Sequence, residues 1–421
     1  MAANRSPFTI HNLPYGINST QDNATRRCAV AFNEWAVDLD VLWRSGVFDG
    51  IEGLEEHVFN NDNLNAFAAL PKTSRLQVRE KLIELLSKGD VTKEAETKDT
   101  FHPLEAVEMH FPMDTRNFSD FYCSLEHTKN CTAIFGNNQI SPSWFTIPSV
   151  YNGRTSSLVV SGTPITRPLG VFPASNDGSV TAPAFQPETH LDFELEMGIF
   201  LSKSVPRGRR LQIQDAKESI FGLVLLNDWS SRNTQFFEMA PLGPFHAKGS
   251  ATSISPWIVP VEALEAVACP RHAPQEPAPL PHLKAPSDEK ATFNIETSVK
   301  LIREGKMYAI GQSNLNELHW TPFQQLTHLG SAGEGLSTGD LFGTGTISSA
   351  RTNGAGEKIG LGCLYERKLT GNELTTAPPD IIETFLQDGD EVVLEGWAIQ
   401  PETGEVLFGF GESRGKVLPA V

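Results

Sequence analysis

Alternating apolar and polar residues mark several segments of the chain as β-strands with one buried face. Cys28, Val30 and Phe32 alternate with small or polar neighbours. Similar alternation, or a short apolar run bounded by turn residues, predicts further strands at 157–163, 191–201, 219–226, 291–301 and 391–398. The clearest hairpin pairs VVLEGWAI (392–399) with EVLFGFGE (405–412) across the turn QPETG.

Helical patterns are fewer. Leucine and valine recur at helical spacing over 74–88, and Gly89 stands where a C-terminal cap belongs. The proline-rich segment 270–286 is typical of an extended loop inside a domain, since strand patterns continue on both sides. These patterns predict a mainly β chain, a β-sandwich or roll rather than alternating β and α units. We place a domain boundary near 112–117.

Composition narrows the classes of function. The formal net charge of −17 at pH 7 opposes binding to nucleic acid and to anionic membranes. Five cysteines without CxxC spacing argue against a disulfide framework or a zinc knuckle and suit a reducing compartment. The opening residues MAANRSPFTI lack the apolar stretch of a signal peptide, so we expect a cytoplasmic protein. An anionic substrate would need local positive charge from a metal ion or from buried Arg and Lys.

Three acids alternate along the segment LDFELEMGIF (191–200). If this segment is a strand, Asp192, Glu194 and Glu196 share one face while the intervening apolar residues enter the core. Neighbouring like charges on a strand face are destabilising unless something neutralises them. A hard cation such as Mg²⁺ or Ca²⁺, which selects oxygen ligands, would do so. The alternative is that these acids face water, as most surface acids do.

Two other segments place acids beside reactive groups. Asp228 follows the apolar run LVLLN, and a strand end is where a rigid scaffold presents functional groups to a cleft. Its carboxylate could equally cap the following turn. The segment SDFYCSLEH offers Asp120, Tyr122 and His127 within a short span, although an isolated histidine is more often structural than catalytic. Spacing alone leaves these alternatives open.

Taken together, many ordered segments resemble the fumarylacetoacetase family over essentially the whole chain. The matching segments are NLPYGINSTQ, MHFP, DFY, VVSGTPITRP, LDFELEMGIF, NDWSSR, PLGPF, ISPW, QQLTH, GDLFGTGTIS, DGDEV and GKVLPA. The resemblance implies an N-terminal SH3-like barrel (1–115), a catalytic β-sandwich or roll domain (116–421) and a homodimer. It also implies a metal-dependent hydrolase of tyrosine and phenylalanine breakdown, which cleaves a C–C bond of a 1,3-dicarbonyl acid, fumarylacetoacetate.

The resemblance also implies roles for individual residues. The residues that match the family's metal ligands, for Mg²⁺ or Ca²⁺, are Asp120, Glu194, Glu196 and Asp228. A secondary cation site matches Asp228, Lys248 and Thr252. His127 matches the general base and Glu366 the glutamate that orients it, and the groups that stabilise the reacting carbonyl match Arg232, Gln235 and Lys248. The positions that contact substrate match Tyr122, Tyr151, Gln235 and Thr346.

Some substrate-binding positions differ from the family pattern. The family has an arginine where this chain has Gly136, a tyrosine at Met239 and a histidine at Asn152. A bidentate contact between arginine and carboxylate cannot be made by glycine. Either Lys129 or Arg154 holds the substrate carboxylate instead, or the substrate lacks that group.

Three functions therefore remain open from the sequence. The chain hydrolyses fumarylacetoacetate, or it acts on a different 1,3-dicarbonyl in secondary metabolism by hydrolysis, decarboxylation or isomerisation, or it is a non-catalytic scaffold. A scaffold would be expected to lose catalytic groups first, and Asp120, His127 and Lys248 are all present. The expected small-molecule substrate is an acidic dicarbonyl.

Overall fold

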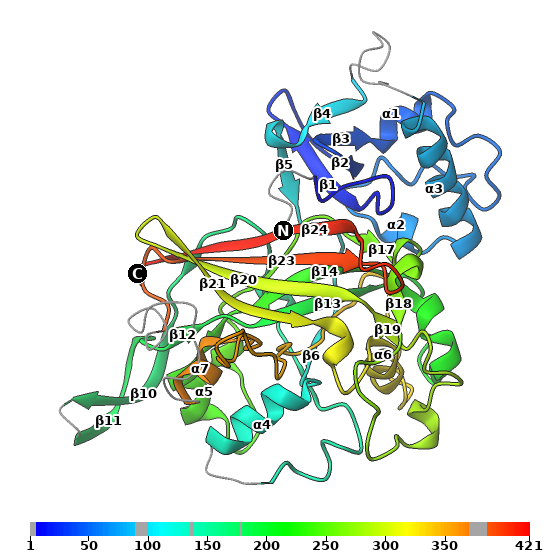
Figure 1. Cartoon of the computed structure of the whole chain (residues 1–421). Helices are drawn as coiled ribbons and strands as arrows, with labels where there is room; N and C mark the ends of the chain where they lie inside the picture. Colours follow the sequence, from blue (N-terminus) through cyan, green and yellow to red (C-terminus); the bar gives the residue numbers. More distant parts are fainter. Residues whose placement is uncertain (1–5, 89–98, 135–138, 177–178, 370–384) are drawn as a thin grey trace.

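A computed structural model describes residues 6–88, 99–134, 139–176, 179–369 and 385–421. The described chain is mainly β, as predicted, and two bodies of sheet are visible in Figure 1. The N-terminal body is an antiparallel sheet in the order β4-β3-β2-β1-β5. Its strands are β1 (Tyr15–Thr20), β2 (Asn23–Phe32), β3 (Trp35–Asp38), β4 (Phe101–Pro103) and β5 (Val107–His110). The helices of this part are α1 (Leu39–Arg44), α2 (Asn65–Ala68) and α3 (Lys72–Leu86).

The larger body contains two main sheets. The first is mixed, in the order β7-β6-β22-β13-β14-β16-β8, with β17 also paired to β14. Its strands are β6 (Phe118–Phe121), β7 (Val150–Asn152), β8 (Leu158–Val160), β13 (Leu195–Leu201), β14 (Ile220–Asp228), β16 (Thr252–Ile254), β17 (Val259–Pro260) and β22 (Leu341–Gly343). The second has the order β21-β20-β23-β24-β9. Its strands are β9 (Ile165–Thr166), β20 (Ile295–Arg303), β21 (Lys306–Asn314), β23 (Glu391–Ile399) and β24 (Val406–Leu418).

Short pairs and helices complete this body. The paired strands are β10 (Leu169–Asn176) with β11 (Ser179–Pro187), β12 (Leu191–Asp192) with β15 (Ser230–Ser231), and β18 (Ala268–Cys269) with β19 (Thr292–Phe293). The helices are α4 (Leu125–Ile134), α5 (Arg232–Glu238), α6 (Pro322–Leu329) and α7 (Leu364–Leu369). Helices α4, α5 and α7 gather below the sheets, and the β10–β11 hairpin projects away from the body (Figure 1).

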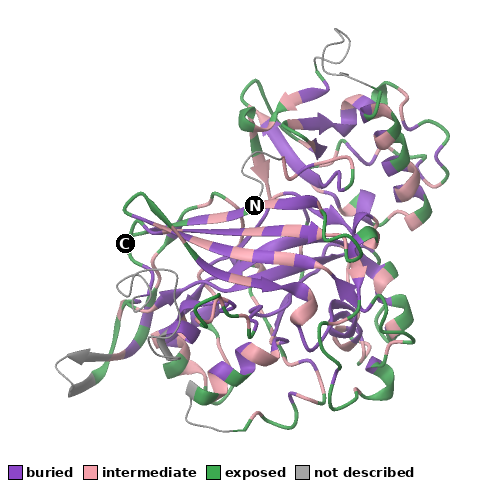
Figure 2. Cartoon of the chain, viewed as in Figure 1, coloured by how far each residue is buried: buried purple, intermediate pink, exposed green. Residues whose placement is uncertain are grey.

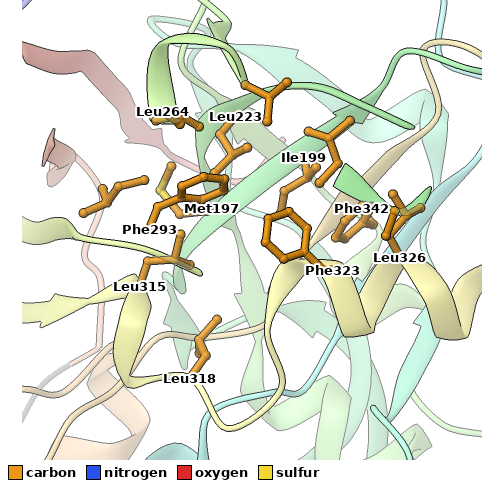
Figure 3. Close-up of a cluster of buried hydrophobic side chains, with 14 of the residues drawn as sticks. Met197, Ile199, Leu223, Leu264, Phe293, Leu315, Leu318, Phe323, Leu326 and Phe342 are labelled. Carbon is orange, nitrogen blue, oxygen red and sulfur yellow. The ribbon is translucent and has the colours of Figure 1, made fainter. Parts of the chain in front are cut away.

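A continuous apolar core lies between the elements of the larger body, and buried residues follow the sheets (Figure 2). In Figure 3, Met197 and Ile199 of β13 meet Leu223 of β14, Phe293 of β19 and Phe323 of α6. Burying side chains of this size stabilises a fold by about 1.5–3 kcal/mol each. Because side chains alternate along a strand, this packing fixes β13 from the face opposite its acid.

The N-terminal sheet shares a second core with the larger body. Leu13 and Tyr15 pack in one cluster with Phe221 and Leu226 of β14. The backbones of Tyr15 and Ile258 also exchange two hydrogen bonds, of 2.9 and 2.7 Å. The strand that ends at Asp228 is thus held from both bodies.

Most predicted elements are present, with changes at their ends. The final hairpin is β23–β24, and the helix expected at 74–88 is α3, whereas Gly89 lies outside the described residues. The predicted continuous strand 191–201 is interrupted at residues 193–194, because β12 pairs with β15 and β13 pairs with β14. Among the described helices, none is long and apolar enough to cross a membrane.

Candidate active site

A cavity of about 300 Å³ is lined by residues at the end of β6, in α4 and in α5. The lining residues on which the sequence prediction depends are Asp120, Tyr122, His127, Tyr151, Glu194, Arg232, Gln235, Lys248 and Thr346. Other walls of the cavity are apolar, and include Phe236, Met239 and Pro244. Residues predicted from separate segments therefore meet around one space.

The acids come from three strands of the mixed sheet. Asp120 lies on β6, Glu196 lies on β13 with Glu194 just before it, and Asp228 ends β14. Carboxylate oxygens of Asp120, Glu194 and Asp228 lie within 4.8 Å of one another. All four residues are buried, at most 5% exposed. The alternative in which the acids of 191–200 face water is therefore wrong, because Asp192 is also fully buried.

Two cations lie against the acids. The Lys248 ammonium pairs with Glu194 and lies 3.1 Å from Asp228 Oδ2. The Arg232 guanidinium donates to Glu194 Oε1 at 2.9 Å and to Asp192 Oδ2, also at 2.9 Å. Arg232 begins α5 at the point where the strand pair β12–β15 ends, so the helix start aims it at the acids.

Hydroxyl groups complete the contacts of Asp228. The Tyr151 hydroxyl lies 2.7 Å from Asp228 Oδ2 and 2.8 Å from Asp120 Oδ2. Thr252 Oγ1 donates to Asp228 Oδ1 at 2.8 Å. Tyr151 comes from β7 and Thr252 from β16, on opposite sides of the acids in strand order. Asp228, Lys248 and Thr252, predicted to share a secondary cation site, are thus neighbours.

The cluster has more negative than positive groups, and the pKa values reflect this. Burial, and then the neighbouring Asp228, raise the pKa of Asp120. Burial, and then Asp120, raise the pKa of Glu196. Glu194 differs: Lys248 and Arg232 overcome the opposing effect of burial and lower its pKa. Opposite pKa shifts of this kind are typical of a buried group of acids whose negative charge is only partly balanced by neighbouring cations.

The acids fit a bound metal ion. Asp120 Oδ1 and Glu196 Oε1 are buried without a hydrogen-bond partner among the described residues. Unpaired buried carboxylate oxygens are costly, whereas a hard divalent cation uses such oxygens as ligands. The donor set suits Mg²⁺ or Ca²⁺ better than a soft metal, because every donor is oxygen.

Two glycines allow the acids to approach. A Cβ at Gly343 would lie 2.7 Å from both Asp120 Oδ1 and Glu196 Oε2. Gly345 has φ +75°, and its amide donates to Glu196 Oε2 at 2.9 Å. Strand β22 runs between β6 and β13, so these positions face the acids directly. Sequence reasoning missed this role, although glycines at and just after the end of a strand were an available signal.

His127, which lines the cavity, forms a buried pair with Glu366. His127 Nδ1 lies 2.9 Å from Glu366 Oε2. The carboxylate also accepts from Asn130 Nδ2 at 2.7 Å and from Ser348 Oγ at 2.7 Å. Asn130 and Ser348 were not identified from the sequence, because they act on Glu366 and have no motif of their own. With Nδ1 engaged, Nε2 is the ring nitrogen left for a reacting group.

Electrostatic interactions favour the charged forms of His127 and Glu366, although both side chains are buried. Burial alone would lower the pKa of His127, but Cys131 and then Glu366 outweigh it and raise it. Burial likewise opposes ionisation of Glu366, yet His127 and the hydrogen-bond donors lower its pKa to about 2. Glu366 is therefore a carboxylate at neutral pH, able to hold a proton on Nδ1.

The three positions that differ from the family pattern do not all lie at the cavity. Met239 lines the cavity, whereas Asn152 is an exposed residue on β7. Gly136 lies outside the described residues. Neither candidate replacement for the missing arginine lines the cavity: Lys129 pairs with Glu126 on α4, and Arg154 stacks over a phenylalanine ring.

The chain is similar to known proteins over nearly its whole length. The family described as Fumarylacetoacetate (FAA) hydrolase C-terminal matches residues 116–417, and Fumarylacetoacetase N-terminal matches residues 11–112. The chain is 38% identical to the fumarylacetoacetase of Arabidopsis thaliana over 99% of this chain and 96% of the relative. It is also 38% identical to the fumarylacetoacetase of Rattus norvegicus over 100% of this chain and 98% of the relative.

A solved structure shows the same fold. The fumarylacetoacetate hydrolase from psychrophilic Exiguobacterium antarcticum superposes with a TM-score of 0.52 at 15% identity, covering 96% of this chain and 99% of that one. The family resemblance found in the sequence segments is thus confirmed by full-length relatives and by both family matches. The chain belongs to the fumarylacetoacetase family.

Proposed function

We propose that this protein is a metal-dependent hydrolase that converts fumarylacetoacetate and water to fumarate and acetoacetate. The observation that carries the proposal is the shared cavity: Asp120 and Glu194 of the acidic cluster line it together with His127, whose Nδ1 contacts Glu366. A metal site alone would suit a binding protein, and a histidine–carboxylate pair alone is common in structural roles. Their convergence supplies both a carbonyl-binding group and a base for water.

The acidic cluster would hold the metal ion. Asp120, Glu194, Glu196 and Asp228 would hold Mg²⁺ or Ca²⁺, which would supply positive charge to polarise the carbonyl groups of a bound substrate. Lys248 and Thr252 support a secondary cation position beside Asp228. Lys248 and Tyr151 bridge these acids, so the donor oxygens are held close together.

The chain's own residues account for the proton transfers. His127 Nε2 takes a proton from water while the water oxygen attacks the carbonyl carbon, and Glu366 stabilises the imidazolium through Nδ1. The new oxyanion lies beside Arg232, Gln235 and Lys248, and each such donor is typically worth about 100- to 1000-fold in rate. The C–C bond then breaks, its electron pair stays on the leaving carbon, and that carbon receives the proton from His127.

Four of the residues that line the cavity would position the substrate. Tyr122, Tyr151, Gln235 and Thr346 line the cavity and would contact the substrate. Gln235 Oε1 accepts from Arg232 Nη1 at 3.0 Å, so its amide NH₂ is left to donate. This orientation suits an amide that binds an oxyanion rather than a cation.

A direct assay tests the proposal. Purified protein with Mg²⁺ or Ca²⁺ should consume fumarylacetoacetate, followed as loss of ultraviolet absorbance, and a chelator should abolish the turnover. His127→Ala should lower kcat by about 100- to 10,000-fold with an unchanged circular dichroism spectrum. Full activity in this folded variant would refute the role of His127.

A second candidate is hydrolysis, decarboxylation or isomerisation of another 1,3-dicarbonyl, one without the second carboxylate. Within the described residues, the cavity's Arg232 and Lys248 are both paired with carboxylates. Comparing kcat/KM for fumarylacetoacetate and for an uncharged 2,4-diketone decides between the two functions. A scaffold without activity is the least supported alternative, and absence of divalent cation binding would be its signature.

We infer that the chain divides near residue 115 and that it forms a homodimer. The N-terminal sheet ends with β5 at His110, and the mixed sheet starts with β6 at Phe118. The β10–β11 hairpin projects from the body (Figure 1), and its directly opposed residues Val171 and Phe185 are 44% and 70% exposed. Exposed apolar pairs on a projecting hairpin suit burial against a second copy.

Cellular placement follows from cysteine usage. All five cysteines are free thiols, which suits the reducing cytoplasm. We infer from this and from the proposed reaction a cytoplasmic enzyme of tyrosine and phenylalanine breakdown. Fractionation of cells with an antibody against the chain would test the location.

A further inference from the structure

One thiol lies in the cavity beside the proposed base, and the reaction above does not use it. Cys131 lines the cavity, whereas Cys28, Cys123, Cys269 and Cys363 are buried. Cys131 Sγ lies 3.6 Å from Nε2 of His127 and 3.9 Å from Nδ1. Both residues are on α4, four positions apart, so one helical turn brings them together.

The contacts around His127 make the imidazole a base for this sulfur. Glu366 lies 2.9 Å from Nδ1, which leaves the nitrogen nearer to the sulfur, Nε2, to accept a proton. A thiol, an imidazole and a carboxylate in this order form the arrangement that activates a sulfur nucleophile. Activated thiols occur in partly exposed positions next to such groups, whereas buried structural thiols are inert.

We propose that Cys131 is a covalent modification site for soft electrophiles, in particular alkenes conjugated to a carbonyl group, and that its modification blocks the cavity. The S–H proton passes to His127 Nε2 as the sulfur bonds to one alkene carbon. The alkene electron pair moves to the other carbon, which then takes the proton from the imidazolium. The addition needs no oxidant or reductant.

The cavity supports this class of ligand. Its volume of about 300 Å³ and its apolar wall at Phe236, Met239 and Tyr365 suit a small uncharged electrophile. An adduct on Cys131 would occupy the space at Nε2 of His127. Loss of hydrolysis after modification rests on the proposed function, whereas the labelling itself does not.

Labelling with N-ethylmaleimide tests the proposal. The native protein is treated briefly, quenched, digested and analysed by mass spectrometry for the adduct at each cysteine. Cys131 is expected to react at least about 10-fold faster than any of the buried cysteines, which serve as internal controls. Labelling of Cys131 no faster than these would overturn the proposal.

Two variants test how the thiol is activated. His127→Asn is expected to slow labelling of Cys131 by about 10-fold or more at neutral pH, with the circular dichroism spectrum unchanged. Should that variant not fold, Glu366→Gln is measured in its place and is expected to slow labelling in the same direction. Equal rates in the folded variant and the native protein would overturn the role of the imidazole.

The effect of labelling on hydrolysis is measured separately from the labelling itself. In the native protein, the loss of fumarylacetoacetate turnover should follow the labelled fraction of Cys131, while Cys131→Ala should retain its own initial activity after the same treatment. Labelled protein with undiminished turnover would overturn the blocking effect. Absence of turnover before treatment, with Cys131 still labelled, would instead count against the proposed function alone.

Discussion

Glu366 Oε2 lies 2.9 Å from Nδ1 of His127, and this contact links helix α7 to helix α4 at the wall of the cavity. Glu366 is fully buried, and it accepts hydrogen bonds from Asn130 and Ser348 as well. The Cys363 thiol also donates to Oε2, at 3.4 Å, so several donors converge on one carboxylate. These contacts hold the imidazole ring through Nδ1, while Nε2 lies 3.6 Å from Cys131 Sγ.

Replacing Glu366 by glutamine should lower kcat by about 100-fold or more. The amide is neutral, so it cannot stabilise the imidazolium, and its NH₂ group would face one of the donors that now converge on the carboxylate. Steady-state kinetics measure the effect. Glu262→Gln is the matched control, since it also removes a buried carboxylate in an ion pair, with Arg75, away from the cavity. An equal loss of kcat in both variants would contradict a specific role.

The pH profile of kcat/KM should have an acidic limb above the ordinary histidine pKa of about 6.5. Cys131 and Glu366 raise the pKa of His127, and a base must be deprotonated to act, so the rate rises as pH rises through that pKa. In Glu366→Gln one raising contribution is lost, and the limb should move to lower pH. An unchanged limb in that variant would show that another group titrates.

Divalent cation should stabilise the protein, and Asp120→Asn should remove most of that effect. A ligand that binds only the folded state at about 100 times its Kd contributes about 2.7 kcal/mol. Thermal unfolding with Mg²⁺ or Ca²⁺, and then with chelator, measures the change in Tm. Asp340→Asn is the control, because this buried acid accepts from Asn117 and does not line the cavity. A Tm shift that survives in Asp120→Asn would place the ion elsewhere.

Replacing Phe185 by aspartate should convert the proposed dimer to a monomer. The charge would lie at the exposed end of an apolar pair with Val171, and an unpaired charge in an interface is costly. Light scattering after gel filtration gives the mass of each species. Met307→Asp is the matched control, because Met307 is an apolar residue that is 59% exposed on β21, away from the hairpin. A native protein that is already monomeric would refute the dimer.

Strand periodicity predicted several strands of the two main sheets, among them β14, β20, β23 and β24, and the resemblance correctly assigned the family. What periodicity could not supply was the break between β12 and β13, because it depends on the pairing of β12 with β15, a strand from a later segment of the chain. The same limit applied to Asp192, whose partner Arg232 begins a helix formed from that later segment. Long-range pairing decided which acids are buried, and the spacing of the acids carries no information on it.

Gly136 shows a different limit. Its substitution was visible in the sequence, but the residues around it lie outside the described structure, so the substrate contact it replaces stays a prediction. Asn130 and Ser348 were missed for a physical reason. Their side chains act on a carboxylate rather than on a ligand, and such support has no fixed spacing along a chain.

The core shared by Tyr15, Phe221 and Leu226 bears on how the molecule comes apart. Removing the N-terminal body would leave apolar side chains of β14 open to water. A fragment that contains only the larger body would thus be prone to aggregate and would not fold as an independent active domain. Heat or denaturant should unfold both bodies in a single transition. A destabilising substitution in the N-terminal body would therefore also abolish activity at the active site in the larger body.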